Sequence, residues 1–160
     1  MKLSNYTLNT SSIQNDFKLL TTDKSLDTKT KGSNNYPKAL IVDDNTEMIS
    51  YLKDIFSDFI DCTFAFNGKE ALRNVREKSF DLIISDLRMP EMDGAQFKKE
   101  LNKIDHYKDI PFILITSVSN LTSLSLKNTL GFNEYIEKPF TKSEIISRVQ
   151  FSLERTLNRK

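Results

Sequence analysis

Short apolar runs alternate with amphipathic stretches from residue 38 onward. Continuous apolar runs predict strands buried on both faces at 38–42, 81–85 and 111–116. Between the runs, apolar residues return every three or four positions, which is the spacing of a helix with one buried side. The same pattern predicts strands at 61–66 and 132–137, a helix after Asn45-Thr46 that carries Met48, Leu52, Ile55 and Phe59, and helices at 67–78, 93–104 and 141–157. The stretch 119–130 is rich in Ser and Thr and is placed as a helix by its position alone.

Five strands therefore alternate with helices along the chain. Continuous apolar strands separated by amphipathic helices indicate an α/β fold, with a parallel sheet covered by helices on both faces. In such sheets the reactive loops follow the carboxyl ends of the strands. The residues at those ends are the first place to look for chemistry.

The first 36 residues have a different composition. The stretch "SLDTKTKGSNN" (25–35) holds too little apolar surface to offset the entropy of ordering, so residues 1–36 are expected to be a flexible N-terminal arm or linker. Ile13, Phe17 and Leu20 have helical spacing, which leaves open a short helix or a docking segment within that arm. Residues 37–158 form the expected domain.

Composition narrows the classes of partner. The 160 residues carry a net charge of +1, which gives no electrostatic reason to expect nucleic acid or an anionic membrane as a partner. The single cysteine, Cys62, rules out an intramolecular disulfide and a cysteine metal cluster. No apolar run is long enough to cross a membrane, and the N-terminus lacks a signal-peptide core, so a cytoplasmic location is expected.

Charged and polar side chains follow four of the five predicted strands. Asp43 and Asp44 follow the first, Asp86 the third, Thr116 ends the fourth and Lys138 follows the fifth. Each residue alone has an ordinary explanation as a cap, a turn residue or a surface side chain. Three carboxylates brought together repel one another unless a cation compensates. With no Cys or His among these strand-end residues, an oxygen-ligated Mg²⁺ fits best.

Four blocks of sequence carry a family resemblance. "LIVDDN" (40–45), "DLIISDLRMPEMDG" (81–94), "PFILITS" (111–117) and "YIEKPF" (135–140) closely resemble the receiver domains of two-component response regulators, in the same order and spacing. The resemblance covers about residues 38–157. It implies a doubly wound, flavodoxin-like (βα)5 fold with strand order 2-1-3-4-5.

The resemblance also implies a role for each strand-end residue. Asp86 matches the phospho-accepting aspartate, and Lys138 matches the lysine that pairs with the phosphoryl group. Mg²⁺ would be held by Asp44 directly, by Asp43 largely through water, by Asp86, and by the backbone carbonyl of Arg88. Thr116 and Tyr135 match the hydroxyl and aromatic switch residues. The peptide bond between Lys138 and Pro139 matches one that is cis in the family.

The implied function is a signalling receiver. It would take phosphate from a sensor histidine kinase or a histidine phosphotransfer domain, and its only catalysis would be its own aspartyl phosphorylation and dephosphorylation. Phosphorylation would alter the surface formed by 119–130, 132–137 and 141–157, which the resemblance also suggests as a homodimer or partner surface. The arm at 1–36 and the long connection at 102–111 resemble receivers attached behind a histidine kinase core.

Two alternatives stay open at this point. A Mg²⁺-dependent phosphohydrolase acting on external substrates would also use an aspartyl phosphate. Such enzymes usually place a second acid two residues after the nucleophile, where this chain has Arg88. The other alternative is a receiver that no longer signals by phosphate and serves only for docking.

Overall fold

One parallel sheet organises the chain. The computed structural model describes residues 36–117 and 131–157. Within them, five strands pair in the order β2-β1-β3-β4-β5, which confirms the predicted fold class. The strands are β1 (Lys38–Val42), β2 (Asp61–Ala65), β3 (Leu82–Asp86), β4 (Phe112–Thr116) and β5 (Glu134–Glu137). The helices are α2 (Thr46–Phe56), α3 (Gly68–Glu77), α4 (Gly94–Leu101) and α6 (Lys142–Leu157), with a 3₁₀ turn at Asp105–Tyr107.

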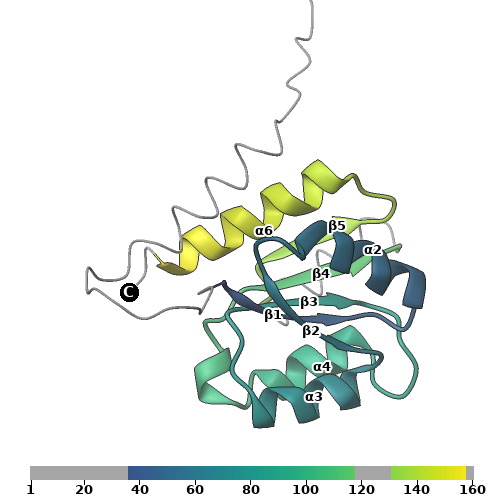
Figure 1. Cartoon of the computed structure of the whole chain (residues 1–160). Helices are drawn as coiled ribbons and strands as arrows, with labels where there is room; N and C mark the ends of the chain where they lie inside the picture. Colours follow the sequence, from purple (N-terminus) through teal and green to yellow (C-terminus); the bar gives the residue numbers. More distant parts are fainter. Residues whose placement is uncertain (1–35, 118–130, 158–160) are drawn as a thin grey trace, which may run out of the picture.

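Helices cover both faces of the sheet. In Figure 1, α2 and α6 lie on one side of the strands, and α3 and α4 lie on the other. Alternate residues of β1 enter the two cores: Ala39 and Ile41 pack with the α2 and α6 side, while Leu40 and Val42 pack with the α3 and α4 side. This is the period-two alternation of a strand buried on both faces. Each face therefore has its own apolar core.

Several element boundaries differ from the prediction. Helix α2 ends at Phe56 rather than at Phe59, because the N–H groups of Phe59 and Ile60 both donate to the Phe56 carbonyl and close a turn there. Phe59 is buried all the same. Strand β5 begins at Glu134, two residues later than predicted, because Asn133 is used in a side-chain contact: its Oδ1 accepts a 2.7 Å hydrogen bond from the N–H of Phe112.

Side-chain caps start the helices soon after the strands. Asn45 accepts hydrogen bonds from the N–H groups at 47 and 48, and Asn67 accepts one from the N–H at 70. Asp93 and Gln96 form a capping box at the start of α4. The Thr141 hydroxyl accepts a hydrogen bond from the N–H at 144. Such caps satisfy the backbone N–H groups that have no partner at the start of a helix. Each helix can therefore begin a few residues after the preceding strand, which keeps the loops short at the edge that carries the candidate site.

The segment 13–20, for which a short helix or a docking role was left open, and the predicted helix at 119–130 lie outside the described residues. Of the helices that the structure does describe, none combines the length and apolar character needed to cross a bilayer.

Candidate functional site

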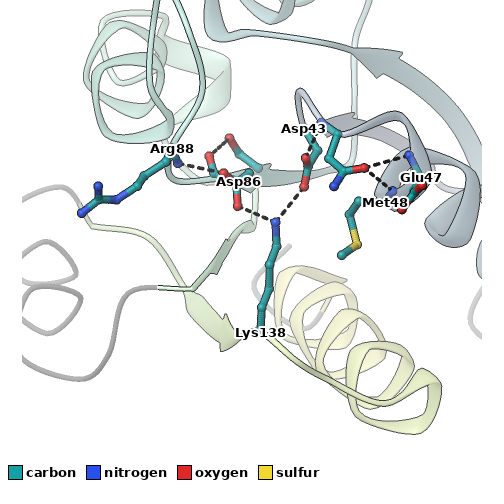
Figure 2. A network of polar contacts seen from close by, with 8 residues as sticks. Asp43, Glu47, Met48, Asp86, Arg88 and Lys138 are labelled. Carbon is teal, nitrogen blue, oxygen red and sulfur yellow. Dashed lines mark hydrogen bonds and ion pairs between the residues drawn. The ribbon is translucent and has the colours of Figure 1, made fainter.

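Three predicted site residues meet at the carboxyl edge of the sheet. Asp43 follows β1, Asp86 is the last residue of β3, and Lys138 follows β5. The Lys138 Nζ lies 3.0 Å from Asp43 Oδ2 and 2.7 Å from Asp86 Oδ1, so one ammonium bridges two carboxylates (Figure 2). Because β4 separates β3 from β5, the long lysine side chain is needed to reach back to Asp86.

Backbone N–H groups hold the other oxygen of each carboxylate. The Arg88 N–H donates to Asp86 Oδ2 at 2.8 Å, and the Asn45 N–H donates to Asp43 Oδ1 at 2.9 Å. Asp43 and Asp86 are only 2% and 7% exposed. Each carboxylate is thus fixed between a backbone donor and the Lys138 ammonium, and its orientation is set before any ligand arrives.

Burial and pairing act in opposite directions on the acid–base properties of these groups. Burial raises the pKa of Asp86 above its usual value, although the hydrogen bond and charge of Lys138 pull it down; the nearby charge of Asp43 adds to the rise. For Lys138, burial lowers the pKa, but its hydrogen bonds to Asp86 and Asp43 outweigh burial and the pKa is raised overall. The ammonium therefore stays protonated at neutral pH, and Asp86 binds protons more readily than an ordinary aspartate.

Two small residues support the backbone at Asp86. The Ser85 hydroxyl donates to the Asp86 carbonyl at 2.9 Å. A Cβ on Gly94 would lie 2.2 Å from that same carbonyl oxygen, so no larger residue fits at the start of α4 without a shift of the backbone. Sequence reasoning did not single out Ser85. The signal for Ser85 is a small polar residue beside an acid in an otherwise apolar run.

The predicted switch residues lie on β4 and β5. Thr116 ends β4 and is 1% exposed, and its carbonyl accepts a 2.8 Å hydrogen bond from the Lys138 N–H. Tyr135 lies opposite Leu114 in the β4–β5 pairing and is half-buried against the core on the α3 and α4 side. The peptide bond between Lys138 and Pro139 is cis. Thr116 is thus joined through the backbone to the lysine that contacts Asp86.

Asp44 and Arg88 are exposed, whereas the residues that precede them, Asp43 and Leu87, are buried. Both line an open hollow of about 610 Å³, together with Leu87, Met89, Pro90, Asp93 and Ala95. Figure 2 shows the Arg88 side chain pointing away from Asp86 and Lys138, while its backbone N–H points at Asp86. The side chain of Arg88 is therefore not part of the buried ion-pair network.

The donor atoms suit a hard cation, but they do not form a closed metal cage. Across residues 36–117 and 131–157, no three acidic, histidine or cysteine side chains lie close enough together to hold a metal ion by themselves. Asp43 and Asp86 share Lys138 instead. Three carboxylates at this edge, counting Asp44, carry more negative charge than one ammonium neutralises. This is an all-oxygen environment in which Mg²⁺, which usually keeps several waters, is chemically compatible.

Comparisons with known proteins agree with this geometry. The model of the response regulator receiver domain matches residues 39–150. A relative is the hybrid signal transduction histidine kinase D of Dictyostelium discoideum, 32% identical over 130 residues, which covers 80% of this chain and 8% of the kinase. The chain spans about half the length of the transcriptional regulators that it also matches, such as PrrA of Mycobacterium leprae at 51%.

Solved receiver structures share the fold. The receiver domain of a signal transduction histidine kinase from Syntrophus aciditrophicus is 32% identical, with a TM-score of 0.69, over 74% of this chain and 90% of that one. The receiver domain of a Pseudomonas aeruginosa sensor histidine kinase, described with a magnesium ion in its active-site cleft, has a TM-score of 0.69 over 74% of this chain and 98% of that one. At 22% identity, this second likeness bears on the fold alone. On the match to residues 39–150, this chain belongs to the response regulator receiver domain family.

Proposed function

We propose that this chain is a cytoplasmic phospho-accepting receiver that takes a phosphoryl group onto Asp86. The donor would be a phosphohistidine of a sensor histidine kinase or of a histidine phosphotransfer domain. The observation that carries the proposal is the Asp86 carboxylate, fixed at a sheet edge between the Arg88 N–H and the Lys138 ammonium. Membership in the receiver family and the relationship to a hybrid histidine kinase support it.

The reaction needs one nucleophile and a stabilised charge. A carboxylate oxygen of Asp86 attacks the phosphorus of the phosphohistidine, an O–P bond forms, and the P–N bond breaks with its electron pair going to the imidazole nitrogen. Water later attacks the acyl phosphate and releases inorganic phosphate, which restores the Asp86 carboxylate. The chain consumes no other substrate in this cycle, so its only catalysis is on itself.

Lys138 supplies positive charge where the phosphoryl oxygens would lie. Its ammonium already contacts Asp86 at 2.7 Å, so it needs little movement to pair with a phosphoryl oxygen carried by that residue. Phosphoryl transfer depends chiefly on alignment and on such charge stabilisation. The Thr116 hydroxyl is proposed to hydrogen-bond another phosphoryl oxygen.

Mg²⁺ is the proposed cofactor. Asp43, Asp44, Asp86 and the Arg88 carbonyl would hold it, with water completing the coordination. When bound, the ion would neutralise charge on the transferring phosphoryl oxygens. The oxygen-only donor set and the excess of carboxylates over ammonium groups at this edge support the choice.

Phosphorylation is proposed to alter one face of the domain. Movement of Thr116 toward a phosphoryl group would vacate space that the half-buried Tyr135 can fill, and the surface formed by 119–130, β5 and α6 would change with it. That surface is the proposed site for an output partner or a homodimer. We further propose residues 37–158 as the receiver domain and 1–36 as a linker to it.

Mass spectrometry after incubation with acetyl phosphate and Mg²⁺ tests the proposal. We expect the mass to rise by one phosphoryl group, the gain to disappear when Mg²⁺ is chelated, and Asp86→Asn to abolish it. Asp109→Asn is the matched control, because this exposed aspartate precedes β4 and lies at the opposite edge of the sheet. Full labelling of the Asp86→Asn variant would remove Asp86 from its role. No labelling of the unaltered chain would favour a receiver that only docks.

A further inference from the structure

A second hollow lies beside α3 and contains none of the predicted site residues. It has a volume of about 370 Å³. Its lining comes from Asn67, Lys69, Leu72, Arg73 and Arg76 on one side and from Glu91, in the loop between β3 and α4, on the other. The helix can be followed along the face of the sheet opposite α2 and α6 in Figure 1.

The hollow is strongly basic. Lys69, Arg73 and Arg76 follow one another at steps of four and three, so they form one stripe along α3. Like charges at this spacing weaken a helix slightly, so helix stability does not account for the stripe. Lys69 pairs with Glu91 at 3.4 Å. Within the described part of the chain, neither Arg73 nor Arg76 has an ion pair, so two guanidinium groups remain available to an anion.

The wall of the hollow is the loop that follows Asp86. Glu91 adopts a φ of 64°, uncommon for a residue other than glycine, and its carboxylate contacts Asn67 Nδ2 at 3.5 Å as well as Lys69. The Gly68 N–H donates to the Met92 carbonyl at 3.0 Å, and a Cβ on Gly68 would lie 2.6 Å from Met92 Cγ. The start of α3 and this loop are therefore in direct contact.

We propose that this hollow binds an acidic segment of a partner protein. Two carboxylates of that segment would pair with Arg73 and Arg76, whose planar guanidinium groups suit bidentate contacts. Leu72, which is half-buried, precedes Arg73 in sequence and lines the same hollow, would receive an apolar side chain of the same segment. A nucleic acid fits less well, because the whole chain has a net charge of only +1 and the three cations of the hollow are few for a phosphate backbone. The site is independent of whether Asp86 accepts phosphate.

Fluorescence anisotropy tests the proposal on the full chain. The probe is a short fluorescein-labelled peptide of Asp and Glu residues around one Leu. We expect saturable binding that weakens as salt is added, and a loss of affinity of about tenfold or more when Arg73→Gln and Arg76→Gln are combined. Arg73→Glu should abolish binding of this peptide.

The matched control removes two other exposed cations, through Lys53→Gln and Lys142→Gln on α2 and α6. This control changes the net charge equally but leaves the hollow intact, so it should bind the peptide like the unaltered chain. Equal loss in both double variants, or no measurable binding by the unaltered chain, would overturn the proposal. Tighter binding of a double-stranded DNA oligonucleotide, or full competition by equimolar inorganic phosphate, would also overturn it, by indicating a nucleic-acid surface or a simple anion site.

Discussion

Asp86 lies where burial disfavours the charged form of its carboxyl group. The Arg88 N–H and the Lys138 ammonium compensate only in part, and its pKa stays above the usual aspartate value. A carboxylate held this way is oriented but not deeply stabilised, which suits a group proposed to form a new covalent bond. The same imbalance has a consequence for the stability of the whole domain.

Replacing Asp86 with Asn should change how stability depends on pH. Because the pKa of Asp86 is raised on folding, the folded chain binds more protons than the unfolded chain between the two pKa values, and stability falls as pH rises through that window. Asp86→Asn removes this fall. We subtract the free energy of unfolding of the unaltered chain from that of the variant, both measured with a chelator present. This difference should grow from about pH 4 upward, by no more than about 1.4 kcal/mol per pH unit. Urea unfolding at a series of values across roughly pH 3 to 8 measures this difference. A difference that stays constant with pH would contradict the raised pKa.

Lys98, on α4, is a second buried ionisable residue. It is not one of the predicted site residues. It is 1% exposed, its Nζ lies 5.2 Å from the centre of the Phe112 ring, and burial lowers its pKa from 10.5 to about 8. A protonated amine there opposes folding, and the contact with the aromatic ring offsets only part of that.

Lys98→Met should stabilise the domain at neutral pH by roughly 1–3 kcal/mol, because the shift in pKa corresponds to about 3 kcal/mol and the lost ring contact reduces the gain. Between pH 8 and 10.5 the unfolded chain binds more protons than the folded one, so the stability of the unaltered chain rises with pH and the advantage of the variant should shrink. The exposed neighbour Lys99→Met is the control and should change stability by less than about 0.5 kcal/mol. A lower stability of the Lys98→Met variant at pH 7 would contradict this prediction. It would mean that contacts of the Lys98 ammonium offset the cost of burying its charge.

At the scale of elements, the contact between α4 and β3 positions the candidate nucleophile. Gly94 starts α4 directly against the Asp86 carbonyl, and its N–H donates to the Leu87 carbonyl at 2.9 Å. The capping box of Asp93 and Gln96 fixes the direction of the helix at this contact. A side chain at position 94 would have to move either the helix or the end of the strand.

Gly94→Ala is therefore expected to destabilise the domain by about 1–3 kcal/mol, as overpacking of a tight contact does. It should also slow phosphorylation by acetyl phosphate, because Asp86 would be displaced from Lys138 and the Arg88 N–H. Gly131→Ala is the control: it adds a Cβ with no atom of the described residues within 4 Å, at a φ of +70°, so it should cost stability but leave the labelling rate unchanged. Equal labelling rates for all three chains, measured by mass spectrometry, would show that the contact at position 94 does not position Asp86.

The sequence predicted these elements through their periodicity, and it predicted which of their ends carry Asp43, Asp86 and Lys138. It was less successful where tertiary contacts decide an end. Phe59 continues the helical spacing of α2 but lies beyond the end of the helix. Asn133 lies outside β5, and its side chain accepts a hydrogen bond from the Phe112 N–H. Lys98 has the sequence pattern of a surface lysine, and only the packing of α4 on Phe112 shows that it is buried. The hollow beside α3 likewise depends on Glu91, which is distant in sequence from the arginines it faces.

At the scale of the whole molecule, the strand order explains why distant residues form one site. With β1 beside β3 and β5 two strands away from β3, the residues that follow β1 and β5 both reach the end of β3. The two cores hold the strands in this register from opposite faces, and the core residues that the structure describes run from Ala39 to Leu153. Both the sheet and the site are thus built from residues within the proposed domain.

Deleting residues 1–35 should leave the domain folded. Because the composition of that stretch holds too little apolar surface to build a core, the free energy of unfolding should change by less than about 1 kcal/mol, and labelling by acetyl phosphate should be unaffected. Deleting 142–160 instead removes Ile145, Ile146, Val149 and Leu153 from one core and should prevent folding. Circular dichroism and urea unfolding of the two truncated chains give the comparison. A loss of more than about 2 kcal/mol on removing 1–35 would contradict the proposed boundary, because only packing of that segment on the domain could account for so large a change.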